Sequence, residues 1–139
     1  MSMHIDRFID ISYSKYNEML IVEFVVNHSL PTQLQMNFLI EDLKASLQML
    51  IKSDIHFGFY IDIRKIGLLS YEHIKLITSV LEQNYVLLEK HLYASAVITE
   101  GDAIKYIFEF VKLVYRTKKP LDFFKTPEEA LKYIEQNRY

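Results

Sequence analysis

The sequence predicts an α/β fold, in which one mixed, mostly parallel sheet of four to five strands has helices on both faces. Runs rich in β-branched residues alternate along the chain with segments whose apolar residues recur every three or four positions. Two of the runs are almost wholly apolar, which is typical of parallel strands that are covered on both faces. The length of 139 residues suits a single domain over 1–139.

The chain opens with two strand-like segments that predict an antiparallel hairpin. Residues 5–12 alternate weakly between apolar and polar side chains. Residues 19–26 (MLIVEFVV) are rich in β-branched residues and too short for a good helix, so they form the stronger strand. The polar link Ser14–Asn17 would connect the two strands.

A long helix is expected next, starting at Leu30-Pro31-Thr32 and ending near Lys52. Its apolar face would consist of Leu34, Phe38, Leu39, Leu43, Leu47 and Leu50. The nearly continuous apolar run 57–63 (FGFYIDI) then predicts a buried strand.

Ser70 is expected to cap the second helix, with Glu72 in the first turn, where the helix dipole favours a carboxylate. The apolar stripe of this helix would be Ile74, Ile77, Leu81, Tyr85 and Leu88. The run 92–99 (LYASAVIT) predicts a second buried strand, whose small residues would let helices pack closely.

The rest of the chain predicts a third helix over 102–117, a short strand over 121–124 and a last helix. The last helix starts with Thr126 as N-cap, Pro127 at the first helical position and Glu129 completing a capping box. The resulting order is β-β-α-β-α-β-α-β-α, and right-handed crossovers make the later strands parallel.

The composition excludes several kinds of site. With 16 basic and 18 acidic residues the formal net charge is -2, which disfavours a partner such as duplex nucleic acid. The absence of Cys excludes thiolate chemistry, and the 3 scattered Gly form no phosphate-binding loop. The 5 His are dispersed, so neither a metal nor another cofactor is expected. Without a basic-then-apolar leader or a long apolar stretch, a cytoplasmic location is the default expectation.

Three segments resemble a known family. The tail PLDFFKTPEEALKYIEQ (120–136), the strand YASAVIT and Asp62 at the end of the central strand are similar to STAS domains. STAS is the fold of anti-sigma-factor antagonists and of the cytoplasmic tails of sulfate transporters. The similarity points in particular to a stand-alone, SpoIIAA-like bacterial branch. This resemblance implies a non-catalytic regulatory module that binds proteins.

Ser70 is the candidate phospho-acceptor under this resemblance. Antagonists that switch by phosphorylation carry an Asp-Ser-Ser-Gly-like turn at the start of the second helix. Here residues 66–72 read IGLLSYE, so Ser70 has the position but lacks the adjacent Asp, Ser and Gly. The alternative is that Ser70 is a plain helix cap.

A candidate ligand site lies at the carboxyl ends of the parallel strands, where open α/β sheets bind ligands. It would contain Asp62, Arg64 and Asp102. The alternative for Asp62 is that its carboxylate accepts hydrogen bonds from loop amides. Ser70 and His73 are one helical turn apart, but no Gly-x-Ser-x-Gly elbow accompanies them, so no enzyme activity is expected.

The predicted third helix carries more apolar surface than a sheet can cover. Ile104, Ile107 and Val111 belong to one stripe, and a second stripe beside it is formed by Tyr106, Phe110 and Leu113. Unless neighbouring helices cover it, the second stripe is a candidate interface, with a second copy in a homodimer as its partner. Because basic residues follow at 116–119, the alternative is a lipid-binding or membrane-surface module, similar in fold to CRAL-TRIO carriers.

Overall fold

The computed structural model describes residues 6–100 and 119–138. Within them, five strands form one sheet in the order β1-β2-β3-β4-β5. The strands are β1 (Ile9–Tyr16), β2 (Met19–Val26), β3 (Phe57–Asp62), β4 (Leu92–Ile98) and β5 (Leu121–Phe124). The β1–β2 pair is antiparallel and the other pairs are parallel, which confirms the predicted mixed, mostly parallel sheet.

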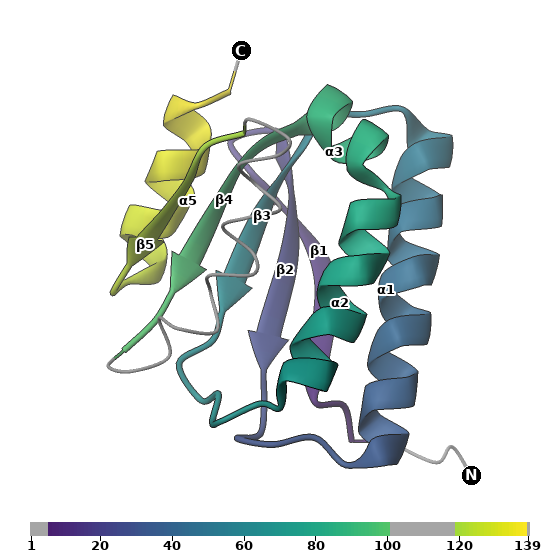
Figure 1. The fold of residues 1–139 in the computed structure, drawn as a ribbon. Coiled ribbons are helices and arrows are strands. Elements are labelled where there is room, and N and C mark those ends of the chain that lie inside the picture. Colours follow the sequence, from purple (N-terminus) through teal and green to yellow (C-terminus); the bar gives the residue numbers. More distant parts are fainter. Residues whose placement is uncertain (1–5, 101–118, 139) are drawn as a thin grey trace, which may run out of the picture.

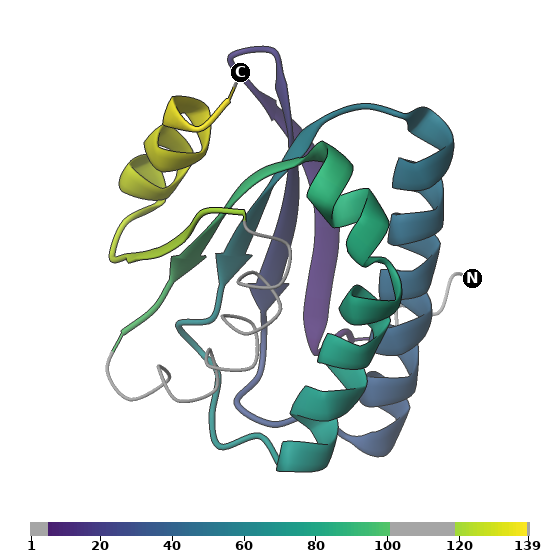
Figure 2. The same cartoon turned by 45° about the horizontal axis from the view of Figure 1, so that its top comes forward.

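Helices cover both faces of this sheet, as predicted (Figure 1). The described helices are α1 (Gln33–Ser53), α2 (Tyr71–Gln83), α3 (Tyr85–His91) and α5 (Pro127–Gln136). Figure 2 shows α1, α2 and α3 on one face and α5 on the other. The larger part of the core lies under α1–α3, and a smaller cluster lies under α5. No described helix is long and apolar enough to cross a bilayer.

The hairpin differs from its predicted bounds. β1 begins at Ile9 and runs to Tyr16, so the predicted strand over 5–12 and the link Ser14–Asn17 were wrong. The turn consists of Asn17 and Glu18, which both have positive φ (49° and 67°), as a type I′ hairpin turn requires. The second half of β1 is polar because its side chains lie at a sheet edge, so its strand character is hard to recognise in the sequence.

α1 follows its predicted bounds closely and begins with a capping box. The Thr32 side chain accepts from the Gln35 backbone N–H at 3.1 Å, and the Gln35 side chain accepts from the Thr32 N–H at 3.0 Å. Leu34, expected on the buried face, is 60% exposed, and Met36 is buried instead. The reason is helical geometry: Leu34 lies two residues before Met36, about 200° around the helix, and so on the side away from the buried residues of α1. Figure 1 shows α1 lying along the sheet.

The predicted second helix is two helices, because the chain breaks at Asn84. The Asn84 backbone N–H bonds to the carbonyls of α2, and its side-chain amide donates to the Val80 carbonyl at 2.8 Å. An Asn side chain that competes for backbone groups in this way favours a helix end. The apolar stripe nevertheless continues across the break, since Leu81 and Leu88 are both buried.

α5 begins as predicted at Thr126, whose side chain accepts from the Glu129 backbone N–H at 3.4 Å. Of the predicted capping box only this half forms, because the Thr126 hydroxyl donates to the Glu129 carboxylate at 2.9 Å. The helix buries Ala130 and Ile134 against the sheet. Its C-terminal end reaches the hairpin turn, where Arg138 Nη1 donates to the Asn17 carbonyl at 2.6 Å.

Candidate functional site

The carboxyl ends of the parallel strands lie at one edge of the sheet, beside the starts of α1 and α2 (Figure 1). Two loops, 27–32 and 63–70, join the strands to these helices at the edge. The loops touch, because the Gly67 N–H donates to the Ser29 carbonyl at 2.8 Å. A Cβ at Gly67 would come within 3.0 Å of Ser29 atoms, so the contact depends on the glycine. This edge is where α/β sheets place their ligands.

Asp62 and Arg64, both candidates from the sequence, bind each other at this edge. The Arg64 guanidinium donates from Nε to Oδ1 at 3.0 Å and from Nη2 to Oδ2 at 2.7 Å. The Arg64 backbone N–H also donates to Oδ1, at 3.1 Å. Burial alone would raise the pKa of the Asp62 carboxyl, but the hydrogen bonds and charge of Arg64 outweigh burial and lower it. The carboxylate is therefore held ionised by its own loop.

Tyr60 lies next to this ion pair on the face of the sheet that α5 covers in part. Its side chain is buried, and burial followed by the nearby Asp62 carboxylate raises the pKa of the phenol. The phenol therefore stays protonated at neutral pH and can act as a hydrogen-bond donor beside Asp62.

Ser70 caps α2, as the sequence predicts, and its side chain accepts from the His73 backbone N–H at 3.1 Å. It is exposed at the edge of the sheet. The ring of His73 does not take part in this contact, and its Nδ1 is buried with no hydrogen-bond partner among the described residues. The Ser70–His73 contact is therefore a helix cap, with no hydrogen bond from the imidazole to the serine hydroxyl.

Large apolar side chains surround the two helix starts and are exposed. We call them the edge patch: Leu30 (55% exposed), Leu34 (60%), Leu68 (71%) and Tyr71 (63%). Leu30 and Leu68 each stand two residues before the cap of a helix, and Leu34 and Tyr71 each lie in a first turn. Sequence reasoning missed this patch, because leucines near a helix start read as core. The repeated arrangement at both starts is the signal that could have revealed it.

Charged residues follow the edge patch along the chain. The segment 64–75 contains Arg64, Lys65 and Lys75 but only one acidic residue, Glu72, and the segment 27–35 contains none. The Lys75 ammonium lies 5.6 Å from the centroid of the Tyr71 ring, within cation–π range. Asp62 neutralises Arg64, and Asp6 lies 2.6 Å from His28, so the cations that the patch has beside it are Lys65 and Lys75, together with the carboxylate of Glu72.

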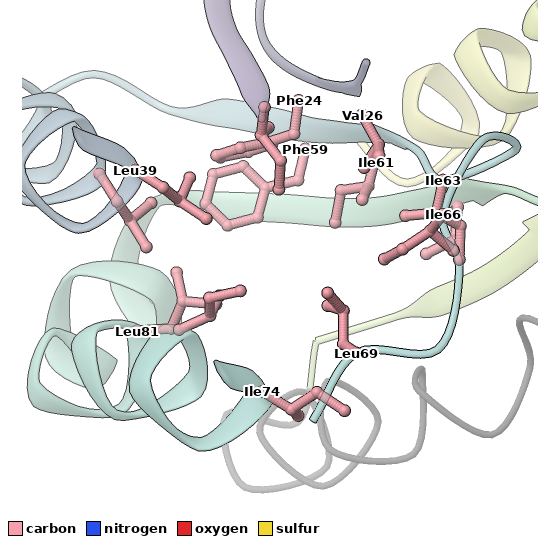
Figure 3. A pocket seen from close by; sticks show the side chains of 14 residues that line it. Phe24, Val26, Leu39, Phe59, Ile61, Ile63, Ile66, Leu69, Ile74 and Leu81 are labelled. Carbon is pink, nitrogen blue, oxygen red and sulfur yellow. The ribbon is translucent and has the colours of Figure 1, made fainter. Parts of the chain in front are cut away.

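An apolar cavity lies directly behind loop 63–70, between the sheet and the helices α1 and α2 (Figure 3). Its volume is about 60 Å³, and every described residue that lines it is apolar. Side chains from the sheet, both helices and the loop point into it, among them Phe24, Phe59, Leu39, Leu81, Ile66 and Leu69. The sequence places these residues in the core but contains no signal that the two layers leave space between them.

The other candidates are not placed by the structure. Asp102 and the three interface candidates Tyr106, Phe110 and Leu113 lie outside the described residues. Among the residues that are described, no three His, Asp or Glu side chains are grouped so that they could hold a metal ion.

Comparison with solved structures identifies the fold of this chain. No family model and no curated protein matches the chain. It is similar to an uncharacterised DUF3478-family protein with a SpoIIAA-like fold from Shewanella loihica, with 17% identity, a TM-score of 0.59, and coverage of 96% of this chain and 98% of that one. It is also similar to an anti-sigma factor antagonist from Mycobacterium paratuberculosis, with 14% identity, a TM-score of 0.54, and coverage of 91% and 94%. These similarities confirm that the resemblance seen in the sequence reflects a SpoIIAA-like fold.

Proposed function

We propose that this protein is a non-catalytic, cytoplasmic regulatory module that acts by binding another protein through the edge patch. The observation that carries the proposal is the patch itself, in which four large apolar side chains are 55–71% exposed at one edge. Contiguous exposed apolar surface in a folded domain marks an interaction site. The shared fold with a protein named as an anti-sigma factor antagonist supports a regulatory role.

Ser70 lies between Leu68 and Tyr71 in the chain and is exposed. A phosphate there would add about −1.5 to −2 charges among apolar side chains that a partner must cover. Ser70 is thus placed where modification would control binding, although its hydroxyl already serves as a cap. The two roles make different predictions, which are given in the Discussion.

Affinity purification from the native cell would test the proposal with two matched variants. Leu68→Glu places a charge in the edge patch, and Val86→Glu places one at a similarly exposed position (61%) on α3. We expect a partner that is retained by the wild type and by Val86→Glu and is lost with Leu68→Glu. A set of co-purified proteins that is the same for all three chains would contradict a protein-binding role for the patch.

A second candidate function is a lipid-binding or membrane-surface module. Lys65 and Lys75, which flank the loop and first turn that carry Leu68 and Tyr71, favour it, because a Lys near an anionic bilayer contributes about 1 kcal/mol. Leucine and tyrosine side chains would then enter the interface while Lys65 and Lys75 meet the headgroups.

Liposome co-sedimentation separates the two candidates. Binding to phosphatidylserine-containing vesicles, but not to phosphatidylcholine vesicles, that fades as salt is added would support the membrane function. Loss of that binding in Leu68→Glu, with retention in Val86→Glu, would assign it to the edge patch. The protein-binding proposal expects no sedimentation with either kind of vesicle.

A further inference from the structure

Leu68 and Leu69 are neighbours in the chain but face opposite sides of loop 63–70. Leu68 is 71% exposed in the edge patch, whereas Leu69 is 8% exposed and lines the apolar cavity. Ile63 and Ile66 of the same loop also line the cavity. One loop therefore forms a wall of the cavity and carries part of the binding surface.

The volume of the cavity limits what it can hold. A water-sized sphere needs about 10–15 Å³ by this measure, so a cavity of about 60 Å³ has room for roughly four or five of them. At about 30 Å³ of liquid for each water, the contents would occupy on the order of 130 Å³. That is the size of a benzene ring or of the last five or six carbons of an aliphatic chain.

The chemistry of the wall limits the ligand further. The described lining offers no hydrogen-bonding side chain, so a polar group inside would lose its hydrogen bonds to water without compensation. Protein interiors rarely contain voids much larger than a water molecule, and apolar cavities of this kind accept hydrocarbons.

We infer that the cavity binds a hydrocarbon group, and that its occupancy moves loop 63–70 and so controls the edge patch. The start of the loop is anchored to the sheet by the Ile63 N–H, which donates to the Ile98 carbonyl at 2.9 Å, and by the Asp62–Arg64 pair. Beyond it, the bonds are local: Ile66 N–H to the Ile63 carbonyl at 3.1 Å, and Leu69 N–H to the Gly67 carbonyl at 3.0 Å. A ligand that displaces Leu69 must also move Leu68, the next residue. The Gly67–Ser29 bond then carries the movement to the loop that contains Leu30.

Hydrocarbon binding in the cavity and movement of loop 63–70 can both be tested without a protein partner. The control of partner binding is the part of the inference that rests on the proposed function. The chain has no Trp, and Leu68→Trp therefore places a single tryptophan in the edge patch. We expect benzene to shift its emission in a saturable way. Val86→Trp, at the opposite end of the helical layer, should show no shift. Phenol, whose hydroxyl would have no partner in the cavity, should leave both variants unchanged.

Methyl NMR of the wild-type chain provides a measurement that needs no variant. Benzene should shift the methyl signals of the lining residues Ile61, Ile74 and Ile77, and should spare the exposed Ile51 and Ile55. Titration with 1-hexanol, whose hydroxyl could remain at the wall, tests in the same way whether an aliphatic chain enters the cavity. If neither compound shifts the lining methyls, the cavity does not bind hydrocarbons. If the methyls shift but the emission of Leu68→Trp does not, the control of the edge patch is refuted.

Failure of these experiments leaves the protein-binding proposal intact, since that proposal is tested by affinity purification and liposome co-sedimentation. Conversely, if the patch binds no protein, saturable shifts would still establish the hydrocarbon site.

Discussion

Gly58 of β3 lies directly beneath Ile134 of α5, so close that a Cβ at Gly58 would overlap Cγ2 of Ile134. Both residues are buried, and Ile134 has no exposed surface. The glycine is what allows α5 to approach the sheet at this point. Any side chain here would move the helix away or force Ile134 out of its position.

Gly58→Ala is therefore expected to destabilise the protein by about 1–3 kcal/mol, the usual cost of overpacking a core. Ile134→Ala alone should cost about 2–5 kcal/mol, because it leaves a cavity. The double variant should be more stable than the sum of the two losses predicts, since the new methyl group enters the space that the isoleucine vacates. Urea denaturation of the three variants would measure this, and strict additivity would contradict the contact.

Ser70→Ala should destabilise the protein by about 0.5–2 kcal/mol through loss of the helix cap, whereas Ser70→Asp, which can also cap, should stay near the wild type. Thermal or urea unfolding would measure both. Phosphate on Ser70 in protein from its native cell, together with altered partner binding, would refute a purely structural role.

The Asp62–Arg64 pair predicts an acid-dependent loss of stability. The pKa of Asp62 is lower in the folded protein than in the unfolded chain, so its contribution is fully present above the unfolded value of about 4. This contribution to stability is lost as the pH falls through the lower pKa that Asp62 has in the folded protein. Because the Arg64 guanidinium is partly in water, solvent screens the pair and keeps this contribution small. Urea midpoints of wild type and Asp62→Asn should differ at neutral pH and converge in acid; a constant difference would contradict this assignment.

Phe110 and Leu113 remain candidates for a self-association surface on sequence grounds alone. Replacing both by Glu should convert a homodimer into a folded monomer, because like charges would meet across the two-fold axis. Light scattering with circular dichroism would measure mass and folding together. A wild type that is monomeric at high concentration would exclude the dimer, and unfolding of the double variant would place both residues in the core.

The sequence predicted the inner strands well because burial on both faces leaves a strong signal. β2 was predicted with its observed bounds, and β4 and β3 to within one residue at their ends. The edge strand β1 was misplaced because Ser12, Tyr13 and Lys15 are exposed and Ser14 is polar, which obscures the alternation. Asn84 interrupts a helix whose apolar stripe continues, so periodicity alone could not locate the break.

The candidate site was predicted less well, for a different reason. The rule that ligands bind at strand ends located Asp62 and Arg64 at the right edge, but their mutual ion pair depends on a tight turn that spacing does not specify. Leu34 was assigned to the buried face by its spacing from Phe38, whereas the buried stripe of α1 begins at Met36 on the other side of the helix. Leu68 was not recognised as a surface residue, because hydrophobicity alone does not reveal which side of a loop faces water. The cavity depends on the separation of two layers, which is a property of the packed structure.

The bond between Arg138 and Asn17 joins residues 121 positions apart, although each strand of the described sheet pairs with the neighbour that precedes it in the chain. A sheet of this order can grow strand by strand during synthesis, starting from the hairpin. Of the described helices, α5 is the one that covers the second face, and it is made last and docks on the hairpin turn, which is made first. A nascent or shortened chain would therefore expose Met19, Ile21 and Ile98, which are buried in the complete fold. Chaperones would bind this exposed apolar surface, and other nascent chains could aggregate through it.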